Sequence, residues 1–85
     1  MKVTIEYFGG HEIELIYLVA SVNEAERVEK VLDASPFKYA VDLVNFVGTI
    51  SVMTAGLGFY VSPPFAEQCR AMLSDNGLSA GMVLR

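Results

Sequence analysis

The sequence predicts a single small α+β domain, and three observations lead to that prediction. First, the chain has 85 residues, which suits one hydrophobic core. Second, two segments carry apolar residues at helical spacing, whereas neighbouring segments alternate apolar and polar residues with the period of a strand. Third, the stretch from Leu43 to Ala66 contains no charged residue, which is typical of a membrane span or of the buried centre of a sheet.

The sheet is the better interpretation of this uncharged stretch. Residues 49–54 alternate between two sets, with Thr49, Ser51 and Met53 on one side and the other three positions on the opposite side. No cluster of Lys or Arg flanks the stretch, as it would at the ends of a span. We therefore expect a half-exposed strand here and no membrane insertion.

The first twenty residues predict two strands joined as a hairpin. From Lys2 to Phe8, polar and apolar residues alternate, which indicates a strand with one exposed face. Gly9-Gly10-His11-Glu12 is predicted to turn, because glycine readily adopts positive φ. Ile13 to Ala20 predicts a second strand, and its run of apolar residues on both faces favours a central position in the sheet.

Two amphipathic helices are predicted from their start and stop signals. The first begins at a capping box, Ser21-Val22-Asn23-Glu24, or in a second register at Asn23 with Glu26, and it ends at Ser35-Pro36. The second begins with Ser62 and Pro63, and it ends at Asn76-Gly77 with the next residue, Leu78, folding back. Their apolar faces carry Ala25, Val28, Val31 and Leu32 in the first helix, and Phe65, Cys69, Met72 and Leu73 in the second.

The remaining segments complete the predicted fold. Tyr39 to Val47 is a strand, and Thr49 to Met53 is its continuation or its partner. Gly56 and Gly58 predict a turn or a bulge before a further strand from Phe59 to Val61, and residues 81–84 predict an edge strand. From Ile13 onward the order is β-α-β-β-α-β. Since both helices need one sheet face to cover, this predicts a two-layer ferredoxin-like sandwich with an additional N-terminal hairpin strand.

Three resemblances accompany these patterns. The opening residues 1–10 look like the first strand of small ubiquitin-like sulfur carriers of the β-grasp fold. Those proteins act through a C-terminal Gly-Gly, whereas this sequence ends in Val83-Leu84-Arg85, so we do not expect that activity. The second predicted helix also argues against the β-grasp fold.

Residues 16–84 resemble a small ferredoxin-like, PII-like signal-transducing family, with an acidic helix of the type Asn23-Glu24-Ala25-Glu26-Arg27-Val28. Residues 50–59 resemble a selenium/sulfur carrier-like family, but Ala55 precedes Gly56 and no Cys is nearby to supply the thiolate that chalcogen transfer needs.

The amino-acid composition limits the kinds of partner that the protein is expected to bind. The hydrophobic fraction of 53% is high for a small domain, so we expect self-association as a dimer or trimer. The formal net charge is −4 and the six basic residues are scattered, which excludes a phosphate-binding stripe for nucleic acid. The opening residues lack the apolar core of a signal peptide, so we expect a cytoplasmic protein.

The candidate sites are few. Cys69 is expected to be a buried, inert thiol, and His11 a solvated turn residue without the further ligands that a metal needs. Backbone N–H groups around Thr54, Gly56 and Gly58 are the candidate ligand-binding groups, and Thr49, Ser51 and Met53 are the candidate interface.

Two functions therefore remain. The first is a non-enzymatic regulatory or interaction module that self-associates through its sheet, with a further protein partner possible. The second is a PII-like protein that binds a small molecule or nucleotide near Gly56 and Gly58. No residue is placed as an acid, base or nucleophile for catalysis, and no cofactor or metal is expected.

Overall fold

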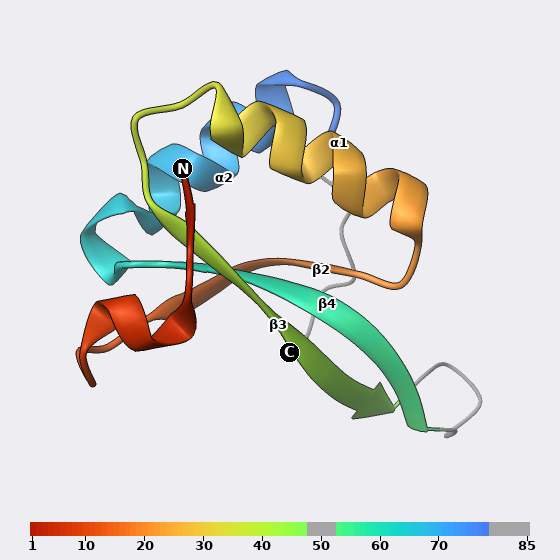
Figure 1. The fold of residues 1–85 in the computed structure, drawn as a ribbon. Coiled ribbons are helices and arrows are strands. Elements are labelled where there is room, and N and C mark those ends of the chain that lie inside the picture. Colours follow the sequence, from red (N-terminus) through yellow and green to blue (C-terminus); the bar gives the residue numbers. More distant parts are fainter. Residues whose placement is uncertain (48–52, 79–85) are drawn as a thin grey trace.

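The computed structural model describes residues 1–47 and 53–78, which form a mixed four-stranded sheet with two α-helices on one of its faces (Figure 1). The order of strands across the sheet is β1-β3-β4-β2. This confirms the predicted α+β class. The elements are β1 (Lys2–Val3), the 3-10 helix η1 (Ile5–Phe8), β2 (Glu14–Val19), α1 (Val22–Asp33), β3 (Tyr39–Val47), β4 (Met53–Val61), the 3-10 helix η2 (Pro63–Phe65) and α2 (Ala66–Asp75).

The sheet is built around β4, which pairs on both sides. It runs antiparallel to β3 from Ala40 opposite Tyr60 to Val47 opposite Met53, without a shift of register. It also runs antiparallel to β2, where the register shifts between Leu15 and Tyr17. An extra residue in one strand of an antiparallel pair is a β-bulge, so β2 is bulged at Ile16.

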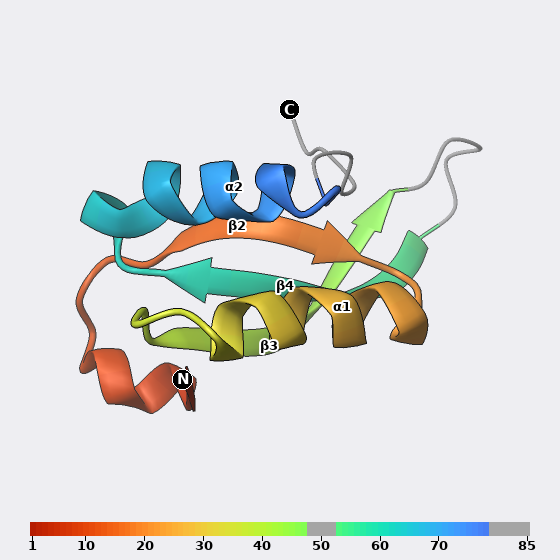
Figure 2. The same cartoon turned by 90° about the horizontal axis from the view of Figure 1, so that it is seen from above.

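The hydrophobic core lies between the helices and the sheet. Figure 2 shows the two helices lying over the sheet, seen from above. Residues that pair across neighbouring strands point to the same face. Tyr17 pairs with Phe59 and Val41 pairs with Phe59, and this row faces the helices. The helices contribute the buried side chains Ala25, Val28 and Leu32 from α1 and Ala66, Cys69 and Leu73 from α2.

The serine half of the predicted capping box forms at the start of α1. Ser21 is the N-cap, and its Oγ accepts a hydrogen bond from the backbone N–H of Glu24 at 3.4 Å. The Glu24 carboxylate accepts a hydrogen bond from the Tyr17 hydroxyl at 2.6 Å, so the first turn of the helix is tied to β2.

The end of α2 also forms as predicted. Gly77 adopts φ +79°, a conformation that favours glycine, and its N–H bonds the carbonyl of Ser74 at 3.0 Å. The N–H of Leu78 bonds the carbonyl of Leu73 at 2.9 Å, and the Leu78 side chain is buried in the core. The helix begins later than predicted, because Pro63–Phe65 form a 3-10 turn first and Phe65 remains partly exposed.

The N-terminal hairpin prediction is wrong. β1 has only two residues, and it pairs in parallel with β3 instead of antiparallel with β2. The next residues close 3-10 turns, in which Tyr7 N–H bonds Thr4 O and Gly9 N–H bonds Glu6 O, both at 3.0 Å. The physical reason is burial of Phe8, a position that a strand with Val3, Ile5 and Tyr7 inward would expose, whereas Tyr7 is 54% exposed.

The prediction of a turn or bulge at Gly56 and Gly58 is also wrong. Both residues lie inside the continuous strand β4, where Gly56 pairs with Val44 and Gly58 pairs with Asp42 on one side and Leu18 on the other. Among the described glycines, only Gly9, Gly10 and Gly77 have positive φ, so the two β4 glycines are not used for a turn. Paired strands on both sides hold this segment extended.

Some predictions concern residues outside the described ranges. The alternation of Thr49, Ile50, Ser51 and Val52 and the predicted edge strand at 81–84 are among them. The strand predicted at Ile13 to Ala20 corresponds to β2, which is the last strand in the described order. Its predicted central position would require a further strand beside it from outside the described residues.

Candidate functional site

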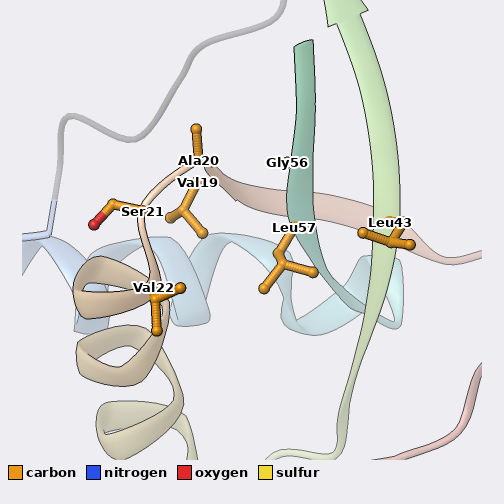
Figure 3. A pocket seen from close by; sticks show the side chains of 7 residues that line it. All are labelled: Val19, Ala20, Ser21, Val22, Leu43, Gly56 and Leu57. Atoms are coloured by element: carbon orange, nitrogen blue, oxygen red, sulfur yellow. The ribbon is translucent and has the colours of Figure 1, made fainter.

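An apolar hollow lies on the helix side of the sheet, where β2 leads into α1 (Figure 3). Its volume is about 150 Å³. In the described part of the chain its lining consists of Val19, Ala20, Ser21, Val22, Leu43, Gly56 and Leu57.

Strand register places the floor of the hollow. Leu57 of β4 pairs with Val19 of β2 on one side and with Leu43 of β3 on the other, so these three side chains form one row across the sheet. Exposure increases along the row, because Val19 is buried, Leu57 is half-buried and Leu43 is 74% exposed. In Figure 3, Leu57 lies between Leu43 and the side chains of Val19 and Val22.

The helix layer ends above this row and leaves it open. α1 begins at Val22, which is 72% exposed at the first helical position. The far halves of β3 and β4 curve away from the two helices (Figure 1), and Leu43 of β3 is left largely exposed. Two aliphatic side chains therefore stand at the rim of the hollow in contact with water.

The hollow is lined mainly by apolar side chains. None of its seven lining residues is ionisable, and the one polar side chain, Ser21, already accepts the N–H of Glu24 as the cap of α1. A phosphate group needs several N–H donors or a cation. The described lining residues supply contacts for an aliphatic or aromatic group.

The structure brings together only part of the predicted ligand site. Gly56 lines the hollow, whereas Gly58 lies within the sheet between Leu18 and Asp42 and does not line it. Thr54 pairs with Phe46 farther along the β3–β4 ladder. Of the predicted interface residues, Met53 is the first residue of β4, opposite Val47, and Thr49 and Ser51 lie outside the described residues.

The residues that sequence reasoning missed had a weak signal. Val22 is an apolar residue at a helix start, and Leu43 is the first residue of the uncharged stretch. Neither residue alone indicates a site. Their proximity depends on the register of three strands, which local sequence does not specify.

The isolated reactive residues are where the sequence predicted them. Cys69 is fully buried in the core, and burial raises the pKa of its thiol, although the neighbouring Arg70 charge acts in the opposite direction. His11 is exposed after the Gly9-Gly10 turn. Within residues 1–47 and 53–78, no group of three or more His, Cys, Asp or Glu side chains is placed to hold a metal ion.

An ion-pair cluster lies between α2 and the start of β2. The Arg70 guanidinium lies 2.7 Å from the Glu14 carboxylate and 3.2 Å from that of Glu67, and it donates a hydrogen bond to the backbone carbonyl of Leu15 at 2.9 Å. These contacts join α2 to the start of β2. Because Arg70 bonds groups of its own chain, we assign the cluster a structural role.

None of the helices in the described ranges is long and apolar enough to cross a bilayer. No protein-family model, no curated protein and no solved structure matches this chain.

Proposed function

We propose that this chain is a small non-enzymatic interaction module that self-associates through its sheet. The observation that carries this proposal is the apolar hollow, with Val22 and Leu43 exposed at its rim and Leu57 half-buried in its floor. Exposed aliphatic side chains that gather in one place on a small domain are typical of an interaction surface, whereas scattered ones are normal. A fold of ferredoxin-like type belongs to the same proposal, since the described part has two helices on one face of a four-stranded sheet.

The size of the hollow favours a side chain over a nucleotide. Pockets for drug-sized ligands measure roughly 300–1,000 Å³. This hollow measures about 150 Å³, and none of its lining residues in the described part of the chain is basic. A single aliphatic or aromatic side chain from a protein partner matches both the size and the chemistry.

The test compares the assembly state of three proteins by sedimentation velocity. We expect the native chain to form a dimer or trimer at tens of micromolar and Leu43→Lys to be shifted strongly toward monomer, because the lysine places a charge in the apolar contact. Tyr7→Gln is the matched control, since Tyr7 is also an exposed large residue but belongs to η1. A native chain that sediments as a 9.3 kDa monomer throughout this range would overturn the proposal.

A second function is favoured by the position of Gly56. It was predicted as part of a ligand site of PII-like type, and it lines the hollow. A small apolar molecule would then occupy the space that a partner's side chain fills in the first proposal. A ligand that binds the folded state raises the unfolding temperature, so a thermal-shift screen in which Leu57→Ala abolishes the shift would support this alternative.

A further inference from the structure

We infer that the domain self-associates by antiparallel pairing of β3 with β3 of a second copy, which joins the two sheets across a two-fold axis. This rests on the proposed self-association and specifies its geometry. The evidence is the free edge of β3, its hydrogen-bonding groups and the position of Leu43.

The edge of β3 that faces away from β4 is open along most of its length. β1 pairs with β3 only at Tyr39 and Ala40. Beyond Ala40, no strand among the described residues pairs with this edge, whereas β3 continues to Val47. Figure 1 shows this part of β3 running away from the helix layer.

The backbone alternation identifies which groups point to the open edge. The N–H of Tyr39 bonds the carbonyl of Met1 at 3.1 Å, so it points away from β4. Residues two apart in a strand direct their N–H and C=O groups to the same side. The N–H of Leu43 agrees, because it bonds the carboxylate of Asp42 at 2.9 Å. The outward-facing residues are therefore Val41, Leu43, Asn45 and Val47.

This edge lacks most of the usual protection against pairing. Natural edge strands are blocked by charged side chains, especially Lys, by Pro or by bulges. Residues 41–47 contain no Lys or Pro, and their ladder with β4 has no register shift. Asp42 is their one charged residue, and its exposed carboxylate must release the Leu43 N–H when the two strands pair. Most of the seven are β-branched or aromatic residues or leucine, which suits a strand in a sheet.

A second copy of β3 fits the edge better than an arbitrary strand because the pairing is self-complementary. With the two-fold axis at Val44, Val41 lies opposite Val47 of the second copy and Leu43 lies opposite Asn45, so all four outward-facing residues are in hydrogen-bonded pairs. The two Asp42 residues are not opposite each other, which avoids a repulsive pair in a chain of net charge −4.

The same register accounts for the exposure of Leu43. Opposite Asn45 of the second copy, Leu43 becomes a diagonal neighbour of the second Leu43 on the helix side of the joined sheet, within reach of side-chain contact. The pairing also places the second copy beside the hollow that Leu43 rims. The exposed leucine and the open edge thus belong to one interface.

The first experiment separates backbone pairing from side-chain contact at one position. Asn45→Pro removes an outward N–H and leaves the inward N–H groups that bond β4, whereas Asn45→Ala removes the side chain and keeps the N–H. We expect Asn45→Pro to raise the dimer dissociation constant about tenfold or more, since the donor is lost at two symmetric positions. Asn45→Ala should change it about threefold at most. Circular dichroism confirms that each variant is folded.

A second experiment, disulfide cross-linking, tests the pairing without introducing a proline into the strand. Val44 lies opposite itself across the axis, at a spacing that a disulfide can bridge. Under mild oxidation, Val44→Cys should form a covalent dimer and Asp42→Cys should not, and the buried Cys69 should not compete. Equal cross-linking of the two variants, or none for Val44→Cys, would overturn the pairing.

The outcomes distinguish this geometry from self-association itself. A native dimer that Asn45→Pro leaves unchanged keeps the proposed function and overturns the β3 pairing. A native monomer overturns both. The chain could also be a monomer whose amides at 41–47 are protected from hydrogen exchange only after an unrelated extended peptide is added. That result would mean that the β3 edge binds a strand of another protein, and it would overturn the pairing with a second copy.

Discussion

The two ends of the helix–sheet interface are completed differently. At the end where α1 leads into β3, Tyr39 is fully buried, its hydroxyl donates to Asp33 at 2.7 Å, and its ring lies 6.2 Å from that of Phe59. At the same end, the Phe37 and Phe65 rings are 5.4 Å apart. At the opposite end, Leu43 and Val22 remain in water beside the hollow.

The difference follows from chain connectivity. Residues 34–38 form a short link that holds the end of α1 close to the start of β3. At the other end, β3 and β4 continue away from the helix layer (Figure 1), and α1 starts above β2. Stability is therefore concentrated at the closed end, while the open end has side chains available for binding. Mutations at the two ends should separate into two classes.

The largest effect is expected from Phe59→Ala. This ring is fully buried in the core beside Tyr39, so truncation should lower the free energy of unfolding by about 3–5 kcal/mol. Urea denaturation followed by circular dichroism measures the change. A loss below about 1 kcal/mol would show that the core relaxes around this position and would remove the contrast between the ends.

A smaller loss is expected from Cys69→Ser. The thiol is fully buried on α2, and the serine hydroxyl would replace it in apolar surroundings, at a cost of about 1–3 kcal/mol. In the native protein, labelling of Cys69 by a thiol reagent should be slow until the chain unfolds, because burial both blocks access and raises the pKa of the thiol. Rapid native labelling would place Cys69 in a mobile part of the core.

Tyr39→Phe should cost about 1 kcal/mol at neutral pH, because the mutation removes one hydrogen bond to Asp33. Burial, followed by the hydrogen bond and charge of Asp33, raises the pKa of Tyr39 above its ordinary value of about 10. The unfolded chain releases this proton first, so the stability is complete below about pH 10 and declines as the pH rises above it.

The variant tests this assignment through the slope of stability against pH. Between about pH 10 and 12, the free energy of unfolding of the Tyr39→Phe variant should decline less steeply than that of the native chain. Some slope should remain, because burial and Asp42 also raise the pKa of Tyr60. Identical slopes for the two proteins would assign the alkaline transition to other groups.

The smallest effect is expected from Leu43→Ala. At a concentration low enough for the chain to be monomeric, the loss should be about 0.5 kcal/mol or less, because the side chain is largely exposed. At higher concentration the loss should grow, since binding of a partner adds to stability by mass action. A concentration-independent loss of about 2 kcal/mol would mean that Leu43 belongs to the monomer core.

The sequence predicted the helices best because their signals are local. Ser21 with Glu24 and Asn76 with Gly77 define helix ends within a few residues, and both form in the structure. The errors arose where distant residues decide the outcome. Phe8 is buried at the cost of a longer first strand, and Gly56 and Gly58 are held extended by pairing with strands on both sides.

The candidate site could be predicted only in part for the same reason. Gly56 was identified from its local setting and does line the hollow. Leu57 and Val19 meet through pairing between residues far apart in the chain, and a shift by one residue would turn Leu57 to the opposite face. Recognition of this site required the register, which the alternation of residues alone left undetermined.

The bulge in β2 sets a limit on stoichiometry. Its register shift between Leu15 and Tyr17 breaks the regular spacing of backbone groups along that strand, which makes the β2 edge a poor template for another β3. Head-to-tail addition, with β3 of one copy on β2 of the next, would otherwise continue without limit as a filament. In the proposed pairing, β3 of one copy would use up the regular edge of the other. Growth would then end at two molecules, and a domain with an open strand edge would remain a finite particle.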